Sequence, residues 1–514
     1  MSTAVNQLRA AKGAALDAGR PQAVARQHKY GKQTARERID ALLDVGSFRE
    51  RGILAQPADA EAGSSPADAL VCGQGTIDGR PIIVCAYDFT VFGGSSGHTG
   101  SLKLRAMALR ALEEGVPFVL LMDGGGKRIQ EGQDSRLFPA SGSIFQMLVD
   151  LSGWVPMVAV ILGPGFAGPS NLASLCDFVV MVRGRSTMGV AGPALVKAAI
   201  GEDIDQESLG GAAVQVDQNG VASLAVDSEG EALDAVKSYL SYLPSNASET
   251  PLARACNEPL VRAPELFANL LPDSNKRAYD VLPVIRALVD EESIFQIKPG
   301  YAKNMITAFA RIDGRAVGIV ANQAKVLGGM LTAPACEKAA HFISICDAFG
   351  LPLVFLIDMP GFSVGSAAET TGLARRSARM AFEIGQATVP RASVVLRKGY
   401  GGGFMVMAGG RNFEPDLSLA WPSAEICAMS IEGAVNVAFA KQIAAADDPA
   451  AEREKKVREV RERIGPLRAA EGFGIDDVVE PHETRGRLAE VFARAPSRRR
   501  SRIQTPRRHP ISPI

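Results

Sequence analysis

Residues 397–410 read RKGYGGGFMVMAGG and contain three consecutive glycines, Gly401, Gly402 and Gly403, behind the apolar run at 394–396. Each glycine lowers the stability of a helix by roughly 1 kcal/mol relative to alanine. Three in a row therefore indicate a site where the backbone must be free of side chains. Three explanations fit the pattern: a strand-to-helix turn, a phosphate cradle, or backbone N–H groups directed at a reacting oxygen.

A second glycine loop, GPGFAG at 163–168, occupies a matching place in the first half of the chain. Gly168 follows Asp123 by 45 residues, and Gly403 follows Asp358 by 45 residues. Backbone N–H groups at such turns can hold a developing oxyanion. Two of them suit a reaction between two carbonyl compounds that each pass through an enolate. Tight turns without any chemistry are the alternative.

Other short patterns indicate other functions. GPGFAG is also a GxGxxG, but a dinucleotide site needs an acidic residue about 20 residues later, where Met188 stands. No GxxxxGK[ST] occurs, which argues against a P-loop ATPase. GGSSG at 93–97 is a GxSxG before a helical pattern, so a serine hydrolase built on Ser95 is kept as an alternative. Its histidine would be His341, whose helical, apolar surroundings favour a packing role instead.

The elements that must position these loops form a repeated series. In each half, an apolar strand ends in aspartate and a glycine loop, and a helical stretch, Val-Pro, a second strand and a second glycine loop follow. This order is typical of parallel β-sheet, and its recurrence after about 235 residues predicts a duplicated domain. The predicted strand-loop segments are 116–132, 154–171, 351–365 and 388–407, the crossover helices are 141–153 and 373–387, and the linker is 241–261.

Composition limits the class of protein. The 514 residues carry a formal net charge of zero, which argues against nucleic-acid or anionic-membrane partners. The basic run at 498–508 therefore predicts a solvated tail or a packing arm. The seven cysteines form no CxxC, so no metal site is predicted, and their dispersal indicates a reducing cytoplasm. No apolar stretch resembles a secretory core or a membrane span, and we expect a cytoplasmic protein.

The chain resembles the carboxyltransferase (β) subunit of biotin-dependent acyl-CoA carboxylases of the propionyl-CoA/acetyl-CoA carboxylase type. The resemblance covers nearly the whole chain and follows the family's motif order. The matching segments are YGKQTARERIDALLDVGSFRE (30–50), DGGGKRIQEG (123–132), GEDIDQESLGGA (201–212), GIVANQAKVLGGML (318–331), FISICDAFGLPLVFLIDMPGF (342–362), LRKGYGGGF (396–404) and RRHPISPI (507–514).

The resemblance implies an α/β fold of two duplicated crotonase-like domains, each a ββα spiral. Residues 1–255 would form the N-terminal domain on the acyl-CoA side, and residues 256–514 the C-terminal domain on the biotin side. The family assembles as a ring-shaped hexamer, with each active site between the N-terminal domain of one subunit and the C-terminal domain of another.

The resemblance also implies the residues of the site. Ala167 and Gly168 would form the oxyanion hole for the acyl-CoA thioester. The hole for the biotin ureido carbonyl would be formed by Gly402 and Gly403, beside Gly401 and Phe362, and Met405 would line the acyl pocket. Valine at Gly403 is then expected to place a branched Cβ against the ureido ring.

The chemistry that the resemblance implies needs oxyanion donors and positioning rather than a side-chain base. Carboxybiotin releases CO2, its nitrogen takes the α-proton of the acyl-CoA, and the resulting enolate attacks CO2. No biotin-attachment motif of the AMKM type occurs. Biotin is therefore expected on a biotin carboxylase/biotin carboxyl carrier partner, which alone uses ATP and bicarbonate.

The chain departs from the family at its substrate loops. The N-terminal hole usually reads Gly-Gly, but here Ala167 and Gly168 are followed by Pro169, and Met405 stands where propionyl-type enzymes commonly have Asp. The usual His-Gly after the PGF loop is also missing. The identity of the acyl group therefore stays open. A transcarboxylase or decarboxylase subunit, and a non-catalytic structural subunit of a carboxylase complex, are alternative functions.

Overall fold

The computed structural model describes residues 2–58, 65–139, 144–498 and 511. Backbone contacts divide the chain into two compact units between Glu249 and Thr250, and Ile511 belongs with the first unit. This division falls inside the stretch 241–261 that was predicted as a linker. The predicted domain boundary after residue 255 lies six residues further along, and the assignment of acyl-CoA and biotin to the two domains stays a prediction.

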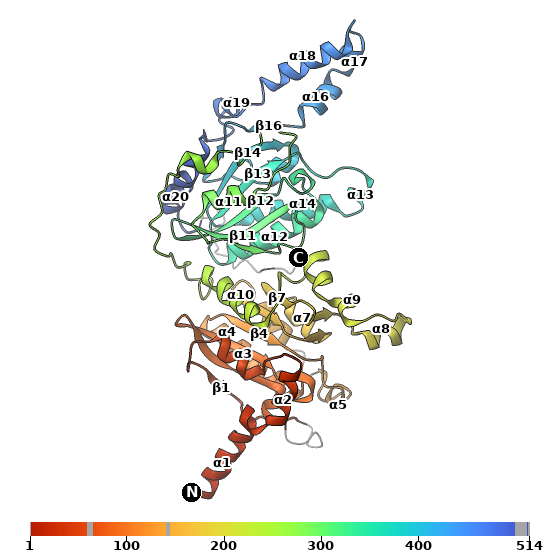
Figure 1. The fold of residues 1–514 in the computed structure, drawn as a ribbon, viewed down its shortest axis with the longest axis vertical. Coiled ribbons are helices and arrows are strands. Elements are labelled where there is room, and N and C mark those ends of the chain that lie inside the picture. The colour runs from red at the N-terminus through yellow and green to blue at the C-terminus, as the bar shows by residue number, and fades with distance from the viewer. Residues whose placement is uncertain (1, 59–64, 140–143, 499–510, 512–514) are drawn as a thin grey trace. The chain divides into compact units, whose positions relative to one another are not determined.

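The first unit is built on a sheet of seven described strands in the order β1-β2-β3-β4-β5-β7-β9 (Figure 1). Strands β1 to β3 pair antiparallel, and β3, β4, β5, β7 and β9 pair parallel. A separate parallel pair joins β6 and β8. The bounds are β1 Arg49–Arg51, β2 Leu70–Ile77, β3 Arg80–Tyr87, β4 Phe118–Met122, β5 Met157–Ile161, β6 Pro164–Phe166, β7 Phe178–Val182, β8 Thr187–Gly189 and β9 Leu224–Val226.

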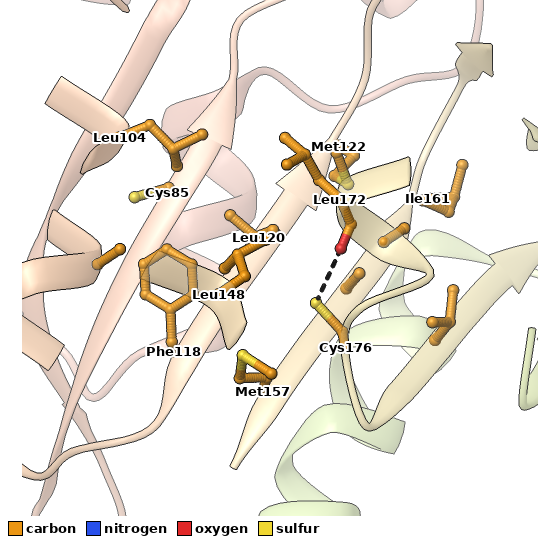
Figure 2. Close-up of a cluster of buried hydrophobic side chains, with 14 of the residues drawn as sticks. Cys85, Leu104, Phe118, Leu120, Met122, Leu148, Met157, Ile161, Leu172 and Cys176 are labelled. Atoms are coloured by element: carbon orange, nitrogen blue, oxygen red, sulfur yellow. Dashed lines mark hydrogen bonds between the residues drawn. The ribbon is translucent and has the colours of Figure 1, made fainter. Parts of the chain in front are cut away.

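Helices cover this sheet, and a buried apolar core lies between the two layers. Strand β4 reads FVLLM and is buried along its whole length, as a central parallel strand requires. Figure 2 shows Leu104 of α4, Leu148 of α6 and Leu172 of α7 packed near the side chains of β4 and β5. The helices are α1 Ser2–Ala15, α2 Pro21–Lys29, α3 Ala35–Leu42, α4 His98–Glu114, α5 Ile129–Gly132, α6 Ile144–Leu151, α7 Gly168–Ala173, α8 Pro193–Ile200, α9 Gln206–Gly210 and α10 Glu229–Tyr242.

The second unit has the same sheet plan, in the order β10-β11-β12-β13-β14-β15-β17 with β16 also paired to β14. Strands β10 to β12 are antiparallel, and the pairs from β12 to β17 are parallel. The strands are β10 Phe295–Ile297, β11 Met305–Ile312, β12 Arg315–Asn322, β13 Leu353–Met359, β14 Arg391–Tyr400, β15 Leu417–Ala420, β16 Glu425–Cys427 and β17 Asp477–Val478. The helices are α11 Leu282–Leu288, α12 Ala333–Ala348, α13 Ser366–Glu369, α14 Leu373–Gln386, α15 Gly401–Val406, α16 Ile431–Ala438, α17 Ala440–Ala444, α18 Pro449–Arg461, α19 Pro466–Glu471 and α20 Thr484–Arg494.

The predicted duplication is confirmed in structural detail. Lys103 on α4 and Lys338 on α12 lie 235 residues apart, and each donates to the carbonyl of the first residue of a strand, Leu70 and Met305 respectively. The parallel pairs β4–β5 and β13–β14 and the crossover helices α6 and α14 lie where the sequence predicts them. The basic run is described only at Arg498, which donates to the carbonyls at the end of α12; residues 499–508 lie outside the described residues.

Each unit brings its glycine loops to one edge of its sheet. The carboxyl ends of parallel strands meet at the same edge, where open α/β sheets bind their ligands. The loops after β3, β4 and β5 therefore converge in the first unit, and those after β12, β13 and β14 converge in the second.

Candidate active site

The turn after β5 contains Ala167 and Gly168, the two residues predicted to hold the thioester. We call it the acyl-side turn after this predicted role. Ala167 adopts a left-handed φ of 63°, and its N–H donates to the carbonyl of Gly189 at 2.8 Å. The N–H of Ala167 is therefore engaged within the protein. The N–H of Gly168 has no acceptor among the described residues, and the next residue, Pro169, has no N–H to offer.

Gly168 combines this unpaired N–H with open space. A Cβ built on Gly168 would have no other atom within 4 Å, and the residue is half-buried. A ligand carbonyl can therefore approach the backbone here without meeting a side chain. Of the two predicted residues, Gly168 has the geometry of an oxyanion donor.

Two neighbouring loops hold this turn from the side. Gly124, in the DGGG loop after β4, donates its N–H to the carbonyl of Pro164 at 3.1 Å. The GGSSG turn after β3 is bound to the same loop, since Ser96 donates to the Gly126 carbonyl and accepts from the N–H of Arg128, both at 2.9 Å. The three strand-end loops thus form one hydrogen-bonded group.

A buried ion network lies at the base of these loops. Asp123 is completely buried and accepts from Lys32 Nζ at 2.5 Å and from Arg38 Nη1 at 2.8 Å. Arg38 also binds Glu229 through two hydrogen bonds of 2.9 and 2.8 Å, and Gln27 donates to Asp123 at 3.3 Å. Burial lowers the pKa of Lys32, and the Asp123 carboxylate opposes that shift.

The biotin-side turn begins where β14 ends. Gly401 has a φ of 63°, a conformation that favours glycine, and the amides of Gly402 and Gly403 have no acceptor among the described residues. Gly402 is exposed, and a Cβ on it would lie 3.3 Å from the ring of Phe362. The structure thus brings Gly401, Gly402 and Phe362 together, and their contact with biotin stays a prediction.

The position of Gly403 differs from the expectation that a side chain there would face the ureido ring of biotin. It is buried, and a Cβ there would overlap Cε of Met359, which is itself fully buried in β13. The missing side chain of Gly403 therefore makes room for the core of the unit. Substitution by valine would crowd that core, and the expected contact of its Cβ with a bound ring is not what this geometry gives.

A second aspartate network supports the biotin-side turn. Asp358 is completely buried and accepts from Arg397 Nε at 2.8 Å and from the backbone N–H of Lys398 at 3.2 Å. The Arg397 guanidinium lies 4.5 Å from the ring centre of Tyr279. Both cations belong to β14, the strand that leads directly into Gly401.

Two side chains flank the biotin-side turn. Tyr400 donates its hydroxyl to Glu425, and burial together with that hydrogen bond raises the pKa of the phenol. Met405 on α15 is 51% exposed, a high value for a large apolar side chain. It is therefore available for contact with a ligand or another chain.

Comparison with known proteins decides the family. The profile of the carboxyl transferase domain matches residues 26–510. The chain belongs to the carboxyl transferase domain family. Its members include the carboxyltransferase subunits of propionyl-CoA carboxylase and of methylmalonyl-CoA carboxyltransferase, and the chain is an acyl-CoA carboxyltransferase of the kind found in biotin-dependent carboxylases.

Two curated relatives and one crystal structure show how far the similarity extends. The carboxyltransferase is 39% identical over 520 residues to the propionyl-CoA carboxylase carboxyltransferase subunit of Haloferax mediterranei, covering 100% of both chains. It is 42% identical to the methylmalonyl-CoA carboxyltransferase 12S subunit of Propionibacterium freudenreichii subsp. shermanii, covering 93% of this chain and 91% of that one. Transcarboxylase 12S crystallised with methylmalonyl-coenzyme A and methylmalonic acid superposes with a TM-score of 0.93 at 40% identity, covering 98% of this chain and 96% of that chain. The predicted crotonase-like α/β fold is thereby confirmed.

Sequence reasoning missed the ion network of the carboxyltransferase. Lys32 and Arg38 lie in the motif YGKQTARER, which carried the resemblance but no predicted role. The available signal was local: Thr34 and Glu37 form a capping box that starts α3 and places Arg38 on it. Their partner Asp123 is 91 residues from Lys32, so the pairing is not readable from spacing.

The hydrolase alternative finds no support in the geometry. Ser96 Oγ lies 3.2 Å from Ser101 Oγ, and within the described part of the chain no hydrogen bond links Ser95 or Ser96 to a histidine. His341 is buried in α12, and burial strongly lowers its pKa. In this carboxyltransferase the GGSSG turn connects two loops, through the hydrogen bonds of Ser96 with Gly126 and Arg128.

Replacing Ser95 or Ser96 singly by alanine is expected to leave most carboxyl transfer intact, because neither hydroxyl has a catalytic partner. The measurement is the rate of acyl-CoA carboxylation by each variant beside the unmodified enzyme. Covalent labelling of either serine by a fluorophosphonate would contradict this role.

One acidic cluster has the geometry of a metal site. Cys256, Glu258 and Asp290 place ligand atoms within 4.8 Å of one another. The Arg485 guanidinium already lies in this cluster, 2.7 Å from Asp290 Oδ1 and 3.6 Å from Cys256 Sγ. Arg485 pairs with Asp290 and Arg262 pairs with Glu258, so each carboxylate has its own cation and the cluster is a structural ion-pair group.

Among the described residues, no helix has the length and apolar character that crossing a membrane requires.

Proposed function

We propose that this carboxyltransferase moves a carboxyl group from carboxybiotin, carried on a separate protein, to the α-carbon of an acyl-CoA. The observation that carries the proposal is the repeated glycine turn. In each unit it follows the parallel strand beside the buried aspartate, and it leaves backbone amides without an internal acceptor.

The acyl-side role goes to Gly168. Its N–H would donate to the thioester oxygen of the acyl-CoA and stabilise the negative charge that develops there when the α-proton leaves. Ala167 would shape the turn rather than donate, because its own N–H is bound to Gly189 at 2.8 Å. The positive φ of Ala167 turns the chain sharply at this point.

The biotin-side role goes to Gly402 and Gly403. Their N–H groups would donate to the ureido oxygen, and Phe362 would lie against the ring, since Gly402 has no side chain to occupy that place. The site therefore fits a flat cyclic urea. Bound carboxybiotin would supply CO2 and the base for the α-proton, so the chain itself needs no catalytic side chain.

The proposal includes partners. The related transcarboxylase 12S is described as a hexamer within a multienzyme core. We extend to this chain a hexameric self-assembly and a biotin carboxylase/biotin carboxyl carrier partner, which alone would use ATP and bicarbonate.

A reconstituted assay tests the function. The purified chain is mixed with a biotinylated carrier and its biotin carboxylase, ATP, labelled bicarbonate and a panel of acyl-CoAs. Label is expected in an acid-stable carboxylated acyl-CoA only in the complete mixture. Covalent biotin on this chain in mass spectrometry, or product from this chain alone, would contradict the division of labour.

Met405 is expected to control the choice of acyl group, because the family resemblance places it in the acyl pocket and its side chain is exposed on α15. Changing it to Asp or Ala is expected to redistribute kcat/KM among acetyl-, propionyl- and longer acyl-CoAs, with shifts of about 1–3 kcal/mol per methylene-sized change in fit. The measurement is kcat/KM for each substrate in all three proteins. An equal loss on every substrate would make Met405 a packing residue.

A transcarboxylase is the second candidate. The identity to the methylmalonyl-CoA carboxyltransferase 12S subunit is 42% over 93% of this chain, against 39% over 100% of this chain for the propionyl-CoA carboxylase subunit. The same two turns would then move the carboxyl group from a carboxylated acyl-CoA to biotin, and the biotin would carry it to a second acceptor elsewhere. Net transfer of label from a carboxylated acyl-CoA through the biotinylated carrier to a second acceptor, without ATP or biotin carboxylase, distinguishes this function.

A further inference from the structure

We infer that Lys32 and Arg38, which precede the duplicated core, are positioning residues for the acyl-side turn and act on it through Asp123. The inference rests on the proposed function, because it assigns Gly168 to the acyl-CoA. Neither cation would touch the substrate. Their role would be to hold the end of β4 in the place where the turn after β5 is built on it.

The contact with the turn is direct. A Cβ on Gly163, the first residue of the GPGFAG loop, would overlap Asp123 Oδ1 and lie 2.8 Å from Lys32 Nζ. The next residue of the loop, Pro164, accepts the N–H of Gly124, the residue that follows Asp123. A shift of the Asp123 carboxylate would therefore be transmitted to the turn that carries Gly168.

In the second unit, the cation beside the buried aspartate comes from a different position in the fold. The last regular pairs are Met122 with Ile161 in the first unit and Ile357 with Val395 in the second. The next residue on the first strand of each pair is the buried aspartate. Two residues further along the second strand of each pair, the first unit has Gly163 and the second has Arg397.

The cation of the second unit therefore comes from its own strand, whereas in the first unit a glycine leaves that space open. Lys32 enters this space from the segment between α2 and α3, and Arg38 reaches the other carboxylate oxygen from α3. The position is fully enclosed: Arg38 is 1% exposed and Asp123 is 0% exposed. The N-terminal segment thus supplies the cations that the second unit takes from its own strand.

Charge makes the arrangement specific. Lys32 and Arg38 carry two positive charges against the two negative charges of Asp123 and Glu229, and the less buried Arg185 lies 3.2 Å from Glu229 at the edge of this group. Removing Lys32 leaves Asp123 with one cation that it must share with Glu229. We expect Asp123 to move toward Arg38 and the turn to follow it.

The test separates the two halves of the reaction. Lys32→Met is expected to lower kcat for acyl-CoA carboxylation by roughly 10–100-fold, the loss typical of a small misplacement of reacting groups. The Kd for acyl-CoA by calorimetry and the acyl-CoA-independent release of CO2 from the carboxybiotin carrier are expected to stay unchanged. Arg397→Met should give the mirror result, with loss of CO2 release and normal acyl-CoA binding.

Two further variants complete the design. Gly163→Ala places a methyl group against the Lys32–Asp123 ion pair. It is expected to reproduce the selective loss of acyl-CoA carboxylation. Lys237→Met, which removes an exposed lysine bound to the Ala41 carbonyl, is the matched control and should behave as the unmodified enzyme. Should Lys32→Met fail to assemble, Gly163→Ala, which disturbs the Lys32–Asp123 pair without removing a charge, is judged by the same criteria.

The outcomes are distinguishable. A selective loss of acyl-side turnover supports the inference. Equal losses in both half-reactions, or no loss in a folded variant, overturn it while the proposed function stands. Absence of any carboxyl transfer by the unmodified enzyme would instead remove the proposed function on which the inference rests.

Discussion

Replacing Gly168 by valine is expected to lower kcat/KM for acyl-CoA carboxylation by about 10²–10³, the size of loss seen when an oxyanion-hole donor no longer acts on the oxygen. The reason is steric. Apart from the chain neighbours and the backbone of α7, no atom of the described residues lies within 4 Å of a Cβ built on Gly168, so the valine side chain would occupy the place proposed for the thioester. Thermal stability is expected to be retained, because the same open space means that no protein atom is displaced.

A matched control is available at Gly465, the residue before α19. It also has no atom within 4 Å of a built Cβ and lacks a positive φ. Gly465→Val should keep both stability and activity, since it probes the same chemical change away from the turns. Full activity in Gly168→Val would mean that the thioester is held elsewhere, and a large drop in its melting temperature would mean that the space is filled in the assembled enzyme.

Replacing Gly402 by valine is expected to reduce carboxyl transfer by a similar factor of about 10²–10³, but through the biotin side. Gly402 is exposed, and its new Cβ would lie 3.3 Å from the Phe362 ring, which is half-buried and can give way. The branched side chain would then stand where the ureido ring is proposed to bind. Acyl-CoA binding measured by calorimetry should be unchanged, whereas CO2 release from the carboxybiotin carrier should be lost.

Gly403→Val provides the contrast for this prediction. Its Cβ is directed at the buried Met359, so overpacking is expected to cost about 1–3 kcal/mol of stability in addition to any loss of activity. Gly402→Val should lose activity with a normal melting temperature. If both variants lost stability equally, the assignment of Gly402 to a ligand-facing position would be wrong.

Much of the architecture was readable from the residues alone. Continuous apolar runs such as FVLLM at 118–122 predict buried parallel strands, because only a strand covered on both faces can be apolar throughout. Glycines after such runs predict turns, and the equal spacing of Asp123–Gly168 and Asp358–Gly403 predicts the duplication. These signals are local or repeated, and the motif order was enough to indicate the family that the comparisons confirm.

The tertiary structure decided what each glycine does and what holds it. Whether a missing side chain faces a ligand or the core depends on the direction of one Cα–Cβ bond, and this separates Gly402 from Gly403 although they are neighbours in the chain. Whether an N–H is available depends on a carbonyl from another strand, and Gly189 takes that of Ala167. The pairing of Lys32 with Asp123 joins residues 91 positions apart, and such a contact has no periodicity or local propensity that could predict it.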